Sequence, residues 1–201
     1  MWQGFAACRR PGVTVLMNRG DSRPSSSSPS RPSYSGMFAL RKARWFWPVF
    51  ATILLADCTS KELIVSALGA RPGPHPVIGD LLRFTVAYNP GAALSIHLGE
   101  WSRVGFGVIA IAALIVLFRL YQRTASNGVL RATALALVAG GALGNLLDRI
   151  RSPRGVVDFI DVGLGDSRFW TFNIADVGVS VGAILLALVL WQEDRAKRVE
   201  P

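Results

Sequence analysis

Long apolar runs separated by short charged segments are the dominant pattern along this chain. Four runs are close to the roughly 17–25 residues that a helix needs to cross the hydrocarbon core of a bilayer. The fold class predicted is therefore an all-α membrane protein, a four-transmembrane-helix bundle. The predicted spans are about 45–68, 104–120, 132–147 and 174–191. Aromatic rings that favour the membrane interface lie at their ends, namely Trp45, Trp47, Tyr121 and Trp191.

The connection between the first two spans has its own predicted structure. Residues 69–76 are interrupted by three prolines, and residues Leu81–Tyr88 then have the composition of a short strand. Asn89-Pro90-Gly91 is typical of a turn. We therefore expect a small β-sheet at one membrane surface.

Flanking charge predicts the orientation of the spans. Cytoplasmic loops are enriched in Lys and Arg, and the basic flanks fall on one side if there are four spans. Both termini should then be cytoplasmic, and the longer connections, roughly 69–103 and 148–173, should face outward. The basic flanking residues are Arg41, Lys42, Arg44, Arg119, Arg123, Arg131, Arg195, Lys197 and Arg198.

Composition narrows the classes of function. The chain has 201 residues, 51% of them hydrophobic, and a net charge of +9. No basic face is interleaved with aromatic residues, so we expect no nucleic-acid partner. Cys8, Cys58, His75 and His97 are too few and too scattered for a structural zinc site or a disulfide framework. We expect no metal and no cofactor.

The first 36 residues differ from the rest. They are rich in Ser, Pro and Arg, cannot bury enough apolar surface to offset the entropy of ordering, and are predicted to be disordered. Alternatively, translation begins at Met37, just before the basic segment and the first apolar run. Residues 37–192 would form the membrane domain and residues 193–201 a charged cytoplasmic tail.

Ionisable residues inside or at the ends of the spans are the functional candidates, because they are costly in a bilayer. Asp57, Lys61 and Glu62 interrupt the outer half of the first span. Asp57 and Lys61 are four residues apart and can pair on one helix face. A structural ion pair marking the helix end is the alternative interpretation.

The third span ends in a second polar group. Asn145 and Asp148 share a helix face near the outer boundary, and Arg149 is suited to hold a backbone carbonyl or a phosphate. The nearby glycines, Gly140, Gly141 and Gly144, favour close helix packing.

Two further acids lie at the same boundary. Asp158 stands between apolar residues after the third span, and Asp176 is in the first turn of the fourth, where it could simply complement the helix dipole. Two poorly solvated carboxylates cannot both ionise cheaply, so one keeps a proton. Such a pair can activate water and protonate a leaving amine, as aspartic proteases do. The protons belong to the pair, so neither residue receives a fixed role.

Five segments together carry a family resemblance. They are Asp57–Lys61, Asn89–Ala93, Gly140–Arg149, Val157–Ile160 and Phe172–Asp176. In their order and spacing the chain resembles lipoprotein signal peptidase (signal peptidase II) from about residue 41 to 191. The resemblance implies that Asp158 and Asp176 match the catalytic aspartates. It also implies that the polar substrate-site positions are matched by Asp57, Lys61, Asn89, Asn145, Arg149 and Asn173.

The resemblance further implies a substrate and a location. The family cleaves prolipoproteins just before a diacylglyceryl-cysteine, carries a β-sheet cradle and a surface helix, and is inhibited by globomycin. The expected partners are lipid-modified prolipoproteins and membrane lipids, and the expected location is the bacterial cytoplasmic (inner) membrane, with the active site near the outer leaflet. We expect a monomer, although Gly178 and Gly182 could pack within or between chains.

Two positions depart from the family pattern. Cys58 stands where the family usually has Gln, and Leu94 where it usually has an aromatic residue. Both bear on packing or substrate fit rather than on the two aspartates. The first 36 residues have no counterpart in the family, which favours a start at Met37.

Three competing hypotheses remain. Leu55-Ala56-Asp57-Cys58 could be a lipobox, but an aspartate immediately before the cysteine and three later spans argue against it. Ser60 and Lys61 could form a serine peptidase, but adjacent helical residues point in different directions. A transporter is disfavoured because the polar residues cluster at one boundary and no inverted repeat is visible.

Overall fold

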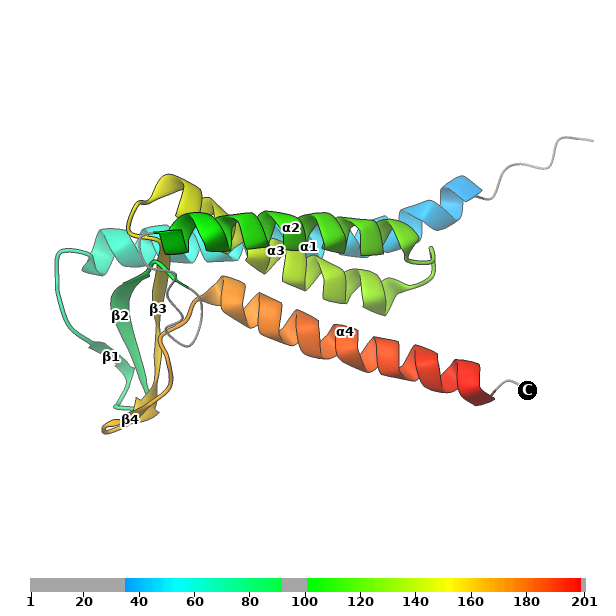
Figure 1. Ribbon diagram of the computed structural model, residues 1–201. Coiled ribbons are helices and arrows are strands. Elements are labelled where there is room, and N and C mark those ends of the chain that lie inside the picture. The colour runs from blue at the N-terminus through cyan, green and yellow to red at the C-terminus, as the bar shows by residue number, and fades with distance from the viewer. Residues whose placement is uncertain (1–34, 92–100, 200–201) are drawn as a thin grey trace, which may run out of the picture. The chain divides into compact units, whose positions relative to one another are not determined.

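The computed structural model describes residues 35–91 and 101–199. The predicted disorder of the N-terminal tail falls on residues outside these ranges, up to residue 34, and so does the departure at Leu94. Four helices and four strands are formed (Figure 1). The helices are α1 (Ser35–Leu68), α2 (Ser102–Arg123), α3 (Val129–Arg151) and α4 (Ile174–Val199), and the strands are β1 (His75–Ile78), β2 (Leu82–Asn89), β3 (Val156–Leu164) and β4 (Ser167–Arg168).

Three helices within the described ranges are long and apolar enough to cross a membrane, namely α2, α3 and residues Ile174–Arg198 of α4. Each begins or ends a few residues beyond its predicted span because the helix continues into its charged flanks. The expected C-terminal tail is accordingly helical as far as Val199. The longest helix, α1, is not among the three. Its apolar run is interrupted by Arg44, Asp57, Lys61 and Glu62.

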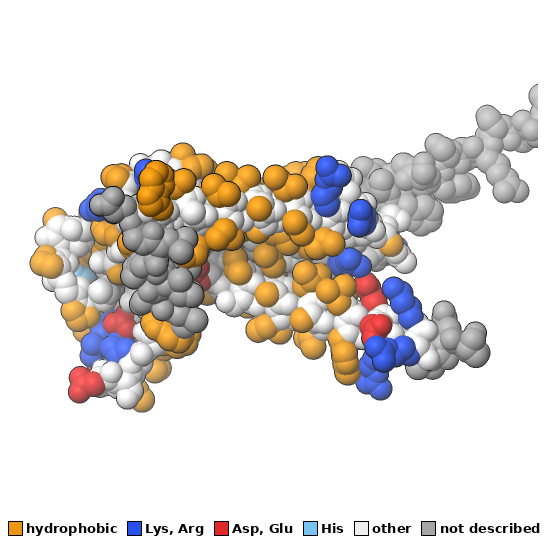
Figure 2. Space-filling view, viewed as in Figure 1, with side chains coloured by type: hydrophobic (Ala, Val, Ile, Leu, Met, Phe, Trp, Pro, Cys, Tyr) orange, Lys and Arg blue, Asp and Glu red, His pale blue; other side chains and the backbone are white. Residues whose placement is uncertain are grey.

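Hydrophobic side chains cover much of the outer surface of the helices (Figure 2). On α2 only Ser102, Leu117 and Tyr121 are buried, whereas Val108, at 60% exposure, and its apolar neighbours face outward. A helix that is apolar on its exposed side needs a nonaqueous environment or a partner. This surface fits a lipid bilayer.

Helix α3 is the centre of the helical layer and packs against α1, α2 and α4. Its buried face is built of small residues, which let the neighbouring backbones approach closely. On α4, a Cβ at Gly178 would lie 2.9 Å from Ile53 of α1, and one at Gly182 would lie 2.9 Å from the Ala134 carbonyl oxygen of α3. The two glycines of α4 therefore pack within the chain.

The helix ends opposite the sheet are joined by an aromatic core and one lysine. The rings of Phe46 on α1 and Tyr121 on α2 lie 4.2 Å apart between centroids. The ammonium of Lys42 donates to the carbonyl oxygens of Tyr121 at 3.0 Å and Thr124 at 2.7 Å. Both carbonyls lie at the C-terminal end of α2, where no following turn of helix supplies an amide four residues on. Lys42 therefore ties α1 to the end of α2.

The four strands form one antiparallel sheet in the order β1-β2-β3-β4, at the other end of the helices (Figure 1). This confirms the predicted small sheet, and β2 lies within one residue of the predicted strand Leu81–Tyr88. A register shift between Phe84 and Ala87 precedes the pairing of Ala87 with Asp158. The loop that follows β4 leads directly into α4, so the sheet and the helices share the segment that carries Asn173.

The close approach of α3 and α4 predicts the effect of enlarging Gly141. A Cβ there would collide with the carbonyl oxygen of Ala175, a backbone atom that cannot rotate away. We expect Gly141→Ala to lower the free energy of unfolding by about 1–3 kcal/mol, the usual cost of overpacking. The measurement is thermal unfolding of the detergent-solubilised protein followed by tryptophan fluorescence.

Gly107→Ala on α2 is the matched control. Its Cβ would meet only a Leu146 methyl group at 3.9 Å, an ordinary van der Waals contact. Alanine also favours a helix over glycine by about 0.8–1 kcal/mol. Equal losses of stability in the two variants would contradict the packing argument.

Candidate active site

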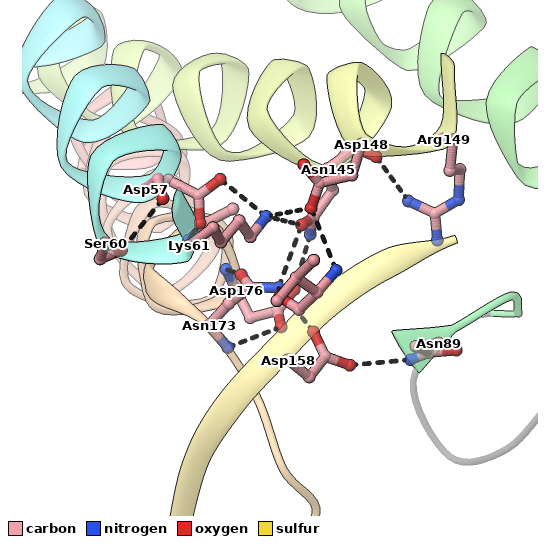
Figure 3. A network of polar contacts seen from close by, with 12 residues as sticks. Asp57, Ser60, Lys61, Asn89, Asn145, Asp148, Arg149, Asp158, Asn173 and Asp176 are labelled. Atoms are coloured by element: carbon pink, nitrogen blue, oxygen red, sulfur yellow. Dashed lines mark hydrogen bonds and ion pairs between the residues drawn. The ribbon is translucent and has the colours of Figure 1, made fainter. Parts of the chain in front are cut away.

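Six side chains, contributed by α1, β2, α3, β3 and the start of α4, meet in one polar network at the sheet end of the helices (Figure 3). Asn173, which precedes α4, donates to both carboxyl groups: its side-chain amide donates to Asp158 and its backbone N–H donates to Asp176. Asn145 of α3 completes the link to Asp176. Asn89 and Lys61 are the other two members. The network thus joins strands and helices that are far apart in the sequence.

Asp158 is almost fully buried, with 4% of its surface exposed. Its Oδ1 accepts a hydrogen bond from Asn173 Nδ2 at 2.6 Å, and its Oδ2 accepts one from Asn89 Nδ2 at 3.1 Å. In the β2–β3 pair the direct partner of Asp158 is Ala87, so Asn89, two residues further along β2, lies diagonally across from Asp158. The carboxyl group is thus held by two amides and by no direct cation among the described residues.

Asp176 is fixed by the start of α4. The backbone N–H of Asp176 donates to Asn173 Oδ1 at 2.9 Å, and the backbone N–H of Asn173 donates to Asp176 Oδ2 at 3.2 Å. This reciprocal pair is the capping-box arrangement, with Asn173 at the N-cap and Asp176 at the third helical position. Asn145 Nδ2 donates to the remaining oxygen, Oδ1, at 2.8 Å. Asp176 is therefore both a helix-capping residue and a member of the network.

The electrostatics of the site favour retention of a proton. Burial, together with the negative charge of Asp176, raises the pKa of Asp158 to about 6. The hydrogen bonds from Asn89 and Asn173 act in the opposite direction because they stabilise the carboxylate, and they offset only part of the shift. Asp158 therefore holds its proton up to about pH 6, well above the ordinary range of an aspartate.

The buried ammonium of Lys61 is linked to Asp176 through the side chain of Asn145. Lys61 Nζ is 2.7 Å from Asp57 Oδ2, 2.9 Å from Asp148 Oδ2 and 3.0 Å from Asn145 Oδ1. This confirms the predicted pairing of Asp57 with Lys61. Asp57 Oδ1 also accepts the backbone N–H of Ala175 at 2.9 Å, so it caps α4 from α1. The cluster joins α1, α3 and α4 at one point.

Arg149 holds the end of the β2 segment. Its Nη2 donates to the carbonyl oxygen of Gly91 at 2.6 Å and its Nη1 to that of Asn145 at 3.0 Å. The backbone N–H of Gly91 in turn donates to Asn89 Oδ1 at 3.0 Å. Arg149 thus binds a backbone carbonyl of this chain and indirectly fixes the side chain of Asn89. Its role in holding a substrate carbonyl or a phosphate stays a prediction.

All eight predicted site residues lie in or directly beside this network, and Asp148 is an addition. Besides pairing with Lys61, Asp148 Oδ2 accepts the backbone N–H of Val157 at 3.1 Å and so fixes the start of β3. Its place on the same helix face as Asn145 was visible in the sequence, but its partners were not. Cys58 is half-buried beside the cluster, on a small cavity of about 170 Å³ that Lys61 and Tyr88 also line.

The geometry does not support Ser60 and Lys61 as a nucleophile and base. Ser60 Oγ donates to the backbone oxygen of Asp57 at 3.0 Å. The Lys61 ammonium points into the network on another side of α1 (Figure 3). The two side chains diverge, as adjacent helical positions require.

Comparison with known proteins identifies the family. The sequence profile of the family described as signal peptidase (SPase) II matches residues 49–192, more than half of the chain. The chain belongs to this family. It is 40% identical over 145 residues to the lipoprotein signal peptidase of Cellvibrio japonicus (strain Ueda107), covering 71% of this chain and 84% of that protein. It is also 40% identical over 159 residues to the lipoprotein signal peptidase of Escherichia coli (strain K12), covering 77% and 93%.

Solved structures agree with the signal peptidase II assignment. One bacterial membrane enzyme, solved in meso at 2.3 Å resolution, shares 29% identity with a TM-score of 0.65, covering 83% of this chain and 94% of that chain. A second, solved at 1.9 Å, shares 31% identity with a TM-score of 0.60, covering 77% and 92%. The expected resemblance is confirmed.

The buried cluster predicts that Lys61 stabilises the fold. Lys61→Met would leave the carboxylates of Asp57 and Asp148 together without a cation, and breaking a buried pair costs about 3–5 kcal/mol. We expect a loss of that size in thermal or denaturant unfolding. A second change, Asp57→Asn, made in the Lys61→Met variant should restore part of the lost stability. It removes one of the two like charges and keeps a side-chain oxygen to accept the Ala175 N–H.

The chain supplies a matched control in the exposed pair Asp194–Arg198, which has the same four-residue spacing. Arg198→Met should cost less than about 1 kcal/mol, as exposed pairs do. The electrostatic argument is wrong if Lys61→Met and Arg198→Met are equally stable.

Proposed function

We propose that this protein is an aspartic endopeptidase that removes signal peptides from diacylglyceryl-modified prolipoproteins, cutting just before the lipidated cysteine. One observation carries the proposal above the others: Asn173 donates to the carboxyl group of Asp158 through its side-chain amide and to that of Asp176 through its backbone N–H. Family membership and the names of the relatives support the substrate class.

The chemistry follows from one shared proton. The ionised member of the pair takes a proton from a water molecule, which attacks the scissile carbonyl carbon, while the protonated member donates to the developing oxyanion. Collapse of the tetrahedral intermediate then breaks the C–N bond: the leaving amine takes a proton from the protonated member of the pair, and the ionised member takes back the proton of the hydroxyl group that becomes the new carbonyl. Asn89, Asn173 and Asn145 keep the two carboxyl groups oriented throughout.

An apolar groove gives a substrate lateral access to the pair. Asp176 lies on a groove of about 580 Å³ that is lined mainly by hydrophobic residues, among them Phe169, Trp170, Phe172 and Val177. A substrate whose cysteine carries acyl chains and whose signal peptide is apolar could enter from the membrane plane by this route. The polar side chains would then accept the backbone groups of the unwound cleavage segment, which are expensive to leave unpaired in lipid.

The same proposal places the protein in the membrane. We take α1 as the fourth span, since two of the three charges in its outer half, Asp57 and Lys61, pair with each other in the buried cluster. The termini would be cytoplasmic, the sheet would form a cradle at the outer leaflet of the inner membrane, and residues 37–192 would suffice as a monomeric peptidase domain. Asp57 and Lys61 would act as positioning residues that set the start of α4.

The first test is mutation of the two aspartates. We expect Asp158→Asn and Asp176→Asn each to lower the rate of cleavage by at least about 100-fold, the scale of a lost general acid or base. The assay incubates purified protein with a diacylated prolipoprotein and follows the gel shift of the released signal peptide. Globomycin should abolish the shift given by the unmodified protein.

Two conservative variants serve as controls. Asp166→Asn changes an exposed acid in the turn beyond β3, and Ser60→Ala removes the hydroxyl of the rival mechanism. Both should cleave at the unmodified rate. Full activity in either dyad variant, or loss of activity in Ser60→Ala, would overturn the mechanism.

The second test is the pH dependence of kcat/KM. The pKa of Asp158 near 6 lies above the ordinary value, so its proton is present below about pH 6 and is lost as pH rises through that point. With both carboxyl groups ionised no general acid remains, and kcat/KM should fall on the alkaline side. Because the Asn89 hydrogen bond lowers the pKa of Asp158, Asn89→Ala should move this alkaline limb to higher pH. If the alkaline limb of Asn89→Ala stays at the same pH or moves to lower pH, Asn89 does not act on the pair.

A further inference from the structure

A second groove runs along the N-terminal half of α1, at the helix ends remote from the acidic network. It has a volume of about 600 Å³, within the range of small-molecule sites. Arg41 and Arg44 stand at one end, and apolar or small side chains continue along its length, including Pro48, Thr52 and Ile53 of α1 and Leu137 of α3.

The groove is open at its basic end and closed at the other. Positions 41, 44, 48 and 52 follow one another on a single face of α1. At 1.5 Å per residue, the distance from Arg41 to Ile53 is about 18 Å, comparable to one acyl chain. Ile53 closes the far end because it lies between α3 and α4: Cβ atoms built on Gly140 and Gly178 would come within 3.2 Å and 2.9 Å of its side chain.

The two arginines at the open end are available to a ligand. Both are exposed, and neither forms a hydrogen bond or ion pair with any residue in the described ranges. Lys42, which lies between them in the sequence, instead donates hydrogen bonds to the carbonyl oxygens at the C-terminal end of α2. Two neighbouring guanidinium groups can hold a phosphate by charge-assisted hydrogen bonds. A zwitterionic phospholipid offers the same phosphate but adds a quaternary ammonium, which the two guanidinium groups would repel.

We propose that this groove binds one anionic glycerophospholipid, with the phosphate between Arg41 and Arg44 and one acyl chain lying along α1 towards Ile53. The basic end is the cytoplasmic end under the orientation rule for Lys and Arg, and the cytoplasmic leaflet is the anionic one. The chain's own N-terminal segment is disfavoured as the occupant by charge, since residues 1–34 carry five arginines and one aspartate. The site is separate from the peptidase site and does not depend on its activity.

The test is a lipid titration of the full-length detergent-solubilised protein, read by native mass spectrometry. Phosphatidylglycerol and phosphatidylcholine with identical acyl chains are compared. We expect the first phosphatidylglycerol to bind at least tenfold more tightly than phosphatidylcholine, equivalent to about 1.4 kcal/mol. Arg41→Gln with Arg44→Gln, a change of exposed side chains only, should abolish this preference.

Two further variants separate the groove from general surface charge. Arg119→Gln with Arg123→Gln removes the same charge from exposed positions at the same end of the bundle, on α2, and should keep the preference. Thr52→Trp leaves the charge unchanged but fills the groove, and should weaken phosphatidylglycerol binding at least tenfold. The proposal is overturned if the α2 variant loses the preference equally, if Thr52→Trp binds normally, or if the unmodified protein does not discriminate. None of these outcomes bears on peptide cleavage.

Discussion

A lysine ammonium buried between carboxylates is the interaction on which the rest of the site depends. Buried charges are costly unless they are paired, so Lys61, Asp57 and Asp148 must meet wherever the helices meet. Asp57 extends this requirement to α4 through the N–H of Ala175. Gly144 permits the approach, because a Cβ there would lie 2.5 Å from Asp57 Oδ2. The relative positions of α1, α3 and α4 are thereby set by one charge cluster.

The start of α4 shows how a stabilising device becomes part of a reactive site. The two interpretations open for Asp176, a first-turn acid and a member of a carboxyl pair, turn out to be compatible. Asn173 caps the helix with its side-chain oxygen and uses its side-chain nitrogen to bind Asp158. A single amide thus fixes both the helix end and the spacing between the two carboxyl groups. Because these contacts are all made within the chain, the geometry exists before any substrate arrives.

Local sequence patterns predicted local structure, but they did not predict the long-range contacts. The apolar runs located the helices, alternation located β2, and the four-residue spacing predicted the pair Asp57–Lys61. The contact of Asn89 with Asp158 depends on the β2–β3 register, including its shift after Phe84, which no local pattern encodes. The bond from Arg149 to the Gly91 carbonyl spans 58 positions. The motif resemblance supplied the site residues because it summarises contacts of this kind, which spacing alone cannot reveal.

The two acids of β3 differ in their surroundings for a simple geometric reason. Side chains alternate along a strand, so Asp158 and Asp161, three positions apart, project from opposite faces. Asp161 meets the guanidinium of Arg168 at 2.6 Å and is neutralised as an ordinary ion pair. Asp158 receives only amides, and the nearest ammonium, that of Lys61, contacts Asn145 instead. A direct ion pair would strongly favour the carboxylate and lower the pKa of Asp158. The asparagine side chains orient the carboxyl groups and separate them from the Lys61 ammonium by one side chain. Because no cation contacts Asp158 directly, burial keeps its pKa near 6.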